Sequence, residues 1–192
     1  MLDPLTSPRK PRIDSLRNRE RLLAAARSAF VELGGDAPLE EIARRAEVGI
    51  GTLYRHFPSR DALLEGMYRD AAAQLAEAAP TLLAQMDPID ALHQWMKLFI
   101  EFIAAKRVVS AAFRARPDDA KPLYATSRQL ILQAVTLLLQ RGTEQGDIRE
   151  GITPADMMRA MTGIAQGFEE PGWEESAGRL VDILVGGLRT LK

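Results

Sequence analysis

The segment Leu39-Glu-Glu-Ile-Ala-Arg-Arg-Ala-Glu-Val-Gly-Ile-Gly-Thr-Leu-Tyr-Arg-His-Phe57 decides how the first third of this chain folds. Its apolar residues have helical spacing on both sides of Glu47-Val48-Gly49, which predicts two short helices joined by a three-residue turn. Leu53 is apolar and Ala43 is small, so the two helices can pack at a steep angle. Pro58 then ends the second helix, because proline disfavours helical backbone at the residue before it.

The helix predicted from Ile50 to Phe57 directs Leu53 and Phe57 toward the core and leaves another face outward. A helix of this size fits the major groove of B-DNA, and its side chains can donate hydrogen bonds to phosphates or base edges. The candidate DNA-binding residues on and after this helix are Ile50, Gly51, Thr52, Tyr54, Arg55, His56 and Arg60. Structural roles remain open beside DNA contact: Tyr54 can pack against the next helix, His56 can cap or pack, and Arg55 can be a solvated charge.

With the following run Ser59-Arg-Asp-Ala-Leu-Leu64, the segment resembles the DNA-binding domain of the tetracycline-repressor (TetR) family. The run Gly-Thr-Leu-Tyr-Arg-His-Phe at 51–57 is its most specific part, and the likeness covers residues 16–75. The resemblance implies a helix-turn-helix head that binds a palindromic operator in double-stranded DNA as a homodimer, most often as a repressor released by a small apolar or amphipathic effector. By position, residues 50, 51, 52, 54 and 56 match family positions that touch DNA, and Arg60 matches one that contacts the backbone.

Two positions depart from the family pattern. Glu47 stands where the family commonly has glycine, and a left-handed backbone there would cost about 1 kcal/mol, so a slightly altered turn is expected. At the start of the second helix, Asp36-Ala37-Pro38 replaces the usual Ser or Thr that also contacts phosphate. Asp36 can serve as the N-cap, but its acid repels phosphate.

Helical spacing continues through the rest of the chain, so the predicted fold is all-α with about nine helices. The first runs over Ser15–Leu33, and the fourth begins after a Ser59 cap and ends at Pro80. Five more are expected over residues 88–106, 108–114, 120–141, 153–168 and 174–191, with Thr153 and Asp156 forming a capping box. The predicted domains are a disordered basic tail (1–15), a helix-turn-helix domain (16–75, motif 38–57) and a C-terminal effector-binding and dimerisation domain (80–192).

The C-terminal domain carries two weaker signals. Apolar residues that can line an effector cavity, or equally form a plain core, are Trp95, Met96, Phe99, Phe102, Ile103, Phe113 and Tyr124. Small residues stand beside large ones in the last two helices, where mid-helix glycine is unfavourable unless another helix approaches closely. The resulting candidates for a dimer interface, with internal packing as the alternative, are Ala160, Gly163, Ile164, Gly167, Leu180, Leu184, Gly187 and Leu188.

Composition excludes several classes of function. The 192 residues include no cysteine and two histidines, which leaves no metal site to expect, and no cofactor-binding or nucleophile motif occurs. We therefore expect neither an enzyme nor a cofactor. No signal peptide or membrane-spanning run is present, so a cytoplasmic protein, associated with the nucleoid when bound to DNA, is expected. The first 60 residues hold eleven Arg or Lys against eight Asp or Glu, which fits an N-terminal end that faces phosphates.

Overall fold

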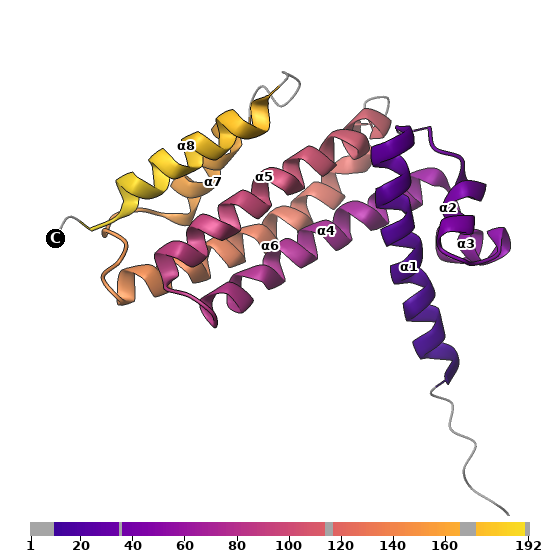
Figure 1. Cartoon of the computed structure of the whole chain (residues 1–192), viewed down its shortest axis with the longest axis horizontal. Coiled ribbons are helices and arrows are strands. Elements are labelled where there is room, and N and C mark those ends of the chain that lie inside the picture. The colour runs from indigo at the N-terminus through magenta and orange to yellow at the C-terminus, as the bar shows by residue number, and fades with distance from the viewer. Residues whose placement is uncertain (1–9, 35, 114–116, 166–171, 191–192) are drawn as a thin grey trace, which may run out of the picture. The chain divides into compact units, whose positions relative to one another are not determined.

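The computed structural model describes residues 10–34, 36–113, 117–165 and 172–190. Within residues 10–13 and 104–124 it describes the backbone only. These residues form eight helices (Figure 1), which confirms the all-α prediction. The helices are α1 (Lys10–Leu33), α2 (Leu39–Arg45), α3 (Ile50–His56), α4 (Arg60–Leu83), α5 (Pro88–Phe113), α6 (Pro117–Glu144), α7 (Pro154–Ile164) and α8 (Trp173–Leu188). The chain forms two compact units, of which the first ends at Met67 and the second begins at Tyr68.

Several helix boundaries differ from the sequence prediction. The helices expected over 88–106 and 108–114 are one helix, α5, because no helix-breaking residue separates them. Pro80 does not end α4, which continues to Leu83. The proline lies near the helix end, where its missing N–H costs one backbone bond, and its own carbonyl still accepts from the Ala84 amide at 3.2 Å. At the N-terminus α1 begins at Lys10, so residues 10–15 of the expected tail are helical.

The first unit is built on the buried face of α1. Leu22, Leu23, Ala26 and Phe30 are buried at the spacing predicted for one face of a helix. Leu33, predicted on the same face, is exposed, because α1 ends there and Gly34 turns the chain with a left-handed φ of 81°. Helix α2 packs against α1, and Leu23 on this face lies 3.4 Å from where a Cβ at Gly66 of α4 would be.

The second unit packs around α5. This helix contacts α6 and α8, and α7 packs between α6 and α8. Trp95 is fully buried, and its indole Nε1 donates to the carbonyl of Leu75 on α4 at 2.7 Å. The Tyr68 and Phe102 rings also join α4 to α5, with their centroids 5.3 Å apart. Large apolar side chains buried in this way each stabilise the fold by roughly 1.5–3 kcal/mol.

A short connection between α6 and α7 is anchored on the end of α8. The Arg149 amide donates to the Leu188 carbonyl at 3.0 Å, within an isolated antiparallel bridge between Ile148 and Arg189. The predicted capping box is confirmed: the Asp156 amide donates to the Thr153 hydroxyl at 3.2 Å, and the Thr153 amide donates to the Asp156 carboxylate at 3.1 Å. Among the residues described, no helix combines the length and apolarity needed to cross a membrane.

The substitution Gly142→Ala is expected to destabilise the protein. A Cβ added at Gly142 on α6 would lie 2.6 Å from Cγ1 of the buried Ile148, so the bridge to α8 would have to move. Overpacking of this kind costs about 1–3 kcal/mol, measurable as a lower urea midpoint. The matched control is Gly178→Ala on α8, where nothing lies within 4 Å of the added Cβ. The control should gain about 0.5–1 kcal/mol, and equal effects of the two substitutions would contradict the prediction.

Candidate nucleic-acid interface

The turn between α2 and α3 is fixed by two backbone hydrogen bonds. The Val48 amide donates to the Ala43 carbonyl and the Glu47 amide to the Arg44 carbonyl, each at 3.0 Å. Glu47 itself is left-handed, with φ of 53°, and among the described residues it is the one non-glycine with positive φ. This two-bond pattern is the usual left-handed ending of a helix. The expected alteration of the turn is therefore wrong: the glutamate adopts the backbone conformation of the glycine it replaces.

The start of α2 also differs from the prediction. Pro38, not Asp36, occupies the N-cap position, and no side chain caps the helix. Ala37 is buried and its amide donates to the Gly34 carbonyl at 3.2 Å. That anchored residue sets where the chain enters the helix, so α2 begins at Leu39 and Asp36 remains exposed before it.

Helix α3 is held in the first unit through its inner face and both of its ends. Leu53 and Phe57 are buried, as predicted. Phe57 approaches α4 so closely that a Cβ on Gly66 would lie 2.7 Å from its ring. After α3, the Ser59 hydroxyl accepts from the Ala62 amide at 3.1 Å, which confirms the predicted cap of α4. The direction of α3 is therefore set by close packing.

The predicted DNA-binding residues divide into two groups by exposure. Ile50, Gly51, Tyr54 and Arg55 are exposed, and 45% of Tyr54 is accessible to solvent. The half-buried group is Thr52, His56 and Arg60. In that group the Arg60 guanidinium lies over the Phe30 ring of α1, 5.8 Å from its centroid. The structure thus brings an apolar side chain, a phenol and a guanidinium onto one short helix, and their contact with DNA stays a prediction.

His56 has a mixed environment. Its Nε2 is buried and lacks a hydrogen-bond partner in the described part of the chain. Burial lowers the pKa of His56 below its usual 6.5, and the nearby charges of Arg55 and Arg19 lower it further. The imidazole is therefore mostly neutral at pH 7, and His56 supplies hydrogen-bonding capacity to this helix with little charge.

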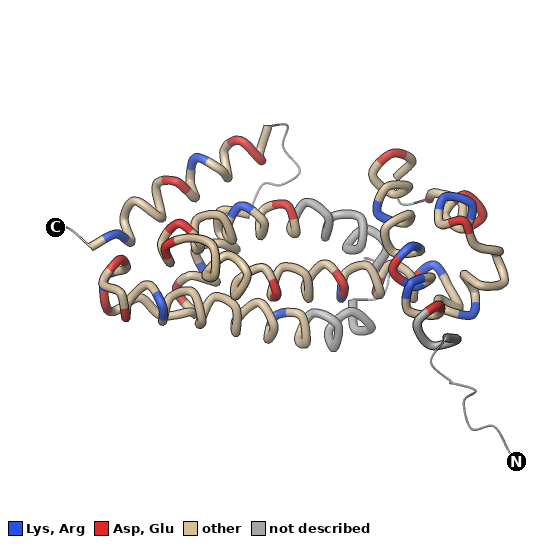
Figure 2. The backbone as a smooth tube through the Cα atoms, turned by 60° about the horizontal axis from the view of Figure 1, so that its bottom comes forward, with Lys and Arg blue, Asp and Glu red and all other residues tan. Residues whose placement is uncertain are grey.

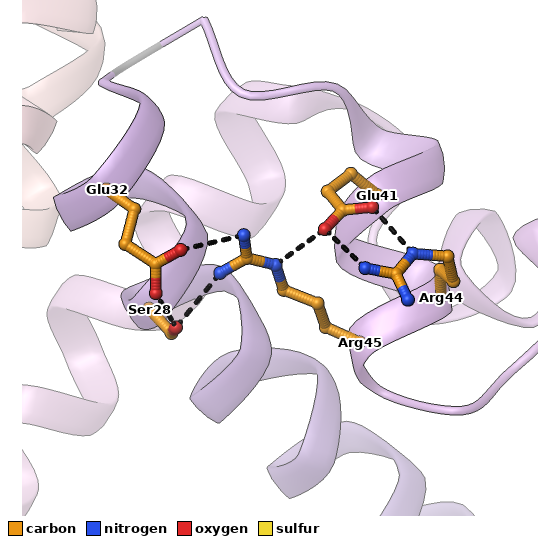
Figure 3. Close-up of polar contacts among 5 residues, drawn as sticks. All are labelled: Ser28, Glu32, Glu41, Arg44 and Arg45. Carbon is orange, nitrogen blue, oxygen red and sulfur yellow. Dashed lines mark hydrogen bonds and ion pairs between the residues drawn. The ribbon is translucent and has the colours of Figure 1, made fainter.

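A network of side chains ties α2 to α1 (Figure 3). Arg45 bonds Glu41 through Nε at 2.8 Å and Glu32 through Nη2 at 2.8 Å, and Nη1 reaches the Ser28 hydroxyl at 3.1 Å. Glu41 also accepts from Arg44 at 2.7 Å and 2.8 Å. Arg45 is therefore not a solvated charge, because Glu32, thirteen residues earlier in the sequence, faces it from α1. Basic and acidic residues are interspersed on α1–α3 (Figure 2), and several of them form these ion pairs.

The predicted effector-pocket residues lie mainly in the interior of the second unit. Trp95, Met96, Phe99 and Phe102 are buried and Ile103 is half-buried, while the Phe113 and Tyr124 side chains lie outside the described set. A separate open groove of about 800 Å³ lies where α4 ends, α5 begins and α6 ends, and it includes none of these residues. Within the described residues, no cluster of His, Asp or Glu could hold a metal ion.

The predicted dimer residues on α7 and α8 are largely accessible. Gly163, Gly187 and Leu180 are exposed, and Ala160, Ile164 and Leu184 are half-buried. Ile183 lies on the same side of α8 with 70% of its surface exposed. Leu188 is buried in the core of the protomer, so it offers no surface to a partner, and Gly167 lies outside the described residues.

Comparison with known proteins matches both parts of the chain. Residues 22–67 match the family described as bacterial regulatory proteins, tetR family, and residues 87–190 match the transcriptional regulator SbtR-like, C-terminal domain. The second match spans more than half of the chain. The chain belongs to the TetR family of transcriptional regulators. Its resemblance to the family, read from residues 16–75, is confirmed.

Two relatives of known structure and one curated relative support the same assignment. A TetR transcriptional regulator from Streptomyces coelicolor is 43% identical, with 91% of this chain and 99% of that chain covered and a TM-score of 0.80. A TetR transcription regulatory protein from Mycobacterium vanbaalenii is 29% identical, with 94% and 99% covered and a TM-score of 0.77. The HTH-type transcriptional regulator UidR of Escherichia coli is 23% identical over 99% of both chains. This TetR-family regulator therefore resembles its relatives along nearly their whole length.

Acid should weaken the ion pairs of Glu41 on α2, one of which holds the Arg45 side chain that reaches α1. Hydrogen bonds from Arg44 and then Arg45 lower the pKa of Glu41 from 4.5 to about 2. Because the folded pKa is depressed, Glu41 contributes stability above about pH 4.5 that is lost as the pH falls toward 2. We expect Glu41→Gln to lower the urea midpoint at pH 7, with the difference from the unmodified protein shrinking below pH 4.5.

The matched control is Glu40→Gln, which removes a charge from the same turn without touching Arg44 or Arg45. A gap between Glu41→Gln and the unmodified protein that stays constant from pH 7 to about pH 3 would show that the ion pairs do not act in this way.

Proposed function

We propose that this TetR-family regulator is a homodimeric repressor that reads a palindromic operator with α3 and leaves it when a small effector binds the second unit. The observation that carries the proposal is the outward face of α3, where Ile50, Tyr54 and Arg55 are exposed above a buried Leu53. In this proposal the first unit is the DNA-binding domain and the second is the effector-binding and dimerisation domain. The protein acts on the nucleoid in the cytoplasm and catalyses no reaction.

A dimer follows from the shortness of the reader helix. Helix α3 has seven residues, which is about 10 Å of helix, so it can contact only a few base pairs. Two heads held about 34–36 Å apart would read two half-sites one helical turn apart, or at a related spacing. The two-fold symmetry of the dimer then accounts for a palindromic operator.

The exposed side of α7 and α8 suits a two-fold contact. Ile183 and Leu180 are large apolar side chains on the surface, and a Cβ added at Gly163 or Gly187 would meet open space. Small residues beside exposed apolar ones allow helices of two subunits to approach closely. Two helices from each subunit would form a four-helix contact that covers these apolar groups.

The apolar interior around α5 supports an effector that is itself apolar or amphipathic. Trp95, Phe99 and Phe102 pack beside each other there, with successive ring centroids 6.1 Å apart. An effector that inserts among them would favour one arrangement of the helices. If that arrangement spaces the two heads wrongly for the operator, effector binding lowers DNA affinity by linkage.

Removing the phenol hydroxyl of Tyr54 should weaken operator binding. Tyr54→Phe keeps the ring and deletes one donor, so the affinity for a duplex from the region flanking its own gene should fall about fivefold. Arg60→Ala should also weaken binding and flatten the salt dependence, because it removes a phosphate contact. Gel shifts at several salt concentrations measure both effects.

The control for these gel shifts is Gln133→Ala, an exposed change on α6 in the other unit. If Tyr54→Phe and Arg60→Ala bind as tightly as the control, with the same salt slope, another surface holds the DNA.

A charge placed on the proposed dimer surface should separate the subunits. In Ile183→Glu, two carboxylates would be buried near the two-fold axis, a desolvation that apolar contact cannot offset. We expect monomers by analytical ultracentrifugation and loss of operator binding with the helix content retained. Leu132→Glu, at an exposed leucine on α6, is the control and should leave the dimer intact. Dimers of Ile183→Glu would place the interface elsewhere.

A further inference from the structure

One contact between α1 and the helix-turn-helix involves both the side chain and the backbone of the same residue. Arg21 Nη2 donates to the Glu47 carboxylate at 2.8 Å and to the Glu47 carbonyl at 3.3 Å. The Arg21 side chain is 43% exposed and that of Glu47 is 84% exposed. A single nitrogen therefore links the charge of Glu47 to the peptide group that leads into Val48.

Glu47 needs such support more than its neighbours do. Its left-handed backbone is unfavourable for a residue with a Cβ. Its carbonyl belongs to the peptide whose amide, on Val48, donates to Ala43 and closes the turn. Helix α3 starts at Ile50, so a rotation at residue 47 would swing the whole reader helix.

The charge of Glu47 is the second reason for support. An unpaired carboxylate just before a helix that approaches DNA would repel phosphates, and Arg21 neutralises it. At the other end of α3, the Arg19 guanidinium lies 5.4 Å from the Phe57 ring centroid. The N-terminal half of α1 thus contacts the residues that flank the reader helix on both sides.

We propose that Arg21 is a positioning residue for DNA recognition, which fixes the left-handed turn at Glu47 and so the direction of α3. This inference rests on the proposed function, in which α3 reads the operator. The competing account is that Arg21 contacts a phosphate itself. An exposed ion pair contributes little to global stability, so the effect of Arg21 is expected in recognition and in the local order of the turn.

The two accounts differ in a double-mutant cycle with Glu47→Gly, since glycine adopts the left-handed turn without support and carries no charge. The variants are Arg21→Ala, Glu47→Gly and the pair together, with Arg17→Ala as the control, an exposed arginine one turn earlier on α1. The probes are a fluorescent duplex that the unmodified protein has selected from a random-sequence pool and a scrambled duplex of the same composition.

A positioning role predicts that Arg21→Ala weakens binding to the selected duplex about threefold to tenfold and to the scrambled duplex less than twofold. In the Glu47→Gly background the same substitution should change neither affinity by more than about twofold. A phosphate contact instead predicts that Arg21→Ala weakens binding to both duplexes in both backgrounds and reduces the salt slope by about 1. That result, or full affinity in Arg21→Ala, would overturn the inference. The control Arg17→Ala shows the same pattern only where Arg17 itself contacts a phosphate.

Hydrogen exchange in the free protein separates this inference from the proposed function. Arg21→Ala should speed exchange of the Val48 amide, because the bond to Ala43 opens more often, and Glu47→Gly should remove that sensitivity. Unchanged Val48 exchange in Arg21→Ala, at an unchanged unfolding midpoint, would reject the positioning role whatever the DNA result. Equal binding of the selected and scrambled duplexes by the unmodified protein would reject the proposed function and leave the exchange result standing.

Discussion

Two buried side chains, Leu53 and Phe57, keep α3 attached to the first unit, and the exposed face of α3 depends on them. A seven-residue helix is far too short to be stable in water on its own, so it stays helical only while one face is packed. Gly66 on α4 completes the contact, because a side chain there would strike the Phe57 ring. With Leu53 and Phe57 packed inward, Ile50, Tyr54 and Arg55 lie on the exposed face of α3.

Charged groups then adjust what apolar packing has set. Arg45 ties α2 to α1 through Glu32, and Arg21 ties the turn to α1 through Glu47. Both links are partly exposed, and exposed ion pairs contribute little to the free energy of unfolding. Their directional hydrogen bonds nevertheless hold two sites in place: the end of α2 at Arg45 and the turn before α3 at Glu47.

The second unit uses α8 in two ways at once. Val181, Val185 and Leu188 are buried in the protomer, while Leu180 and Ile183 face outward among glycines. A helix with apolar groups on both faces is costly in a monomer that leaves one face in water. The proposed dimer covers the exposed apolar face and relates the two α3 helices by two-fold symmetry. Helix α5 supplies the apolar interior in which an effector would have to compete with existing packing.

The amino-acid sequence by itself determined the all-helical fold, the helix-turn-helix, the Ser59 and Thr153 caps and the family, because these depend on local spacing and on residues close together in the chain. It mispredicted the end of α4 at Pro80, the separate helix after Lys106 and the N-cap at Asp36. A proline near a helix end costs only one backbone bond, no breaker interrupts α5, and the anchored Ala37 moves the start of α2 past Asp36. Only the tertiary structure decided the backbone of Glu47 and the partners of Arg21 and Arg45. The partner of Arg21 is Glu47 in the α2–α3 turn, and that of Arg45 is Glu32 on α1, 26 and 13 residues away in the sequence. No local pattern encodes which charges the packing of helices will bring together.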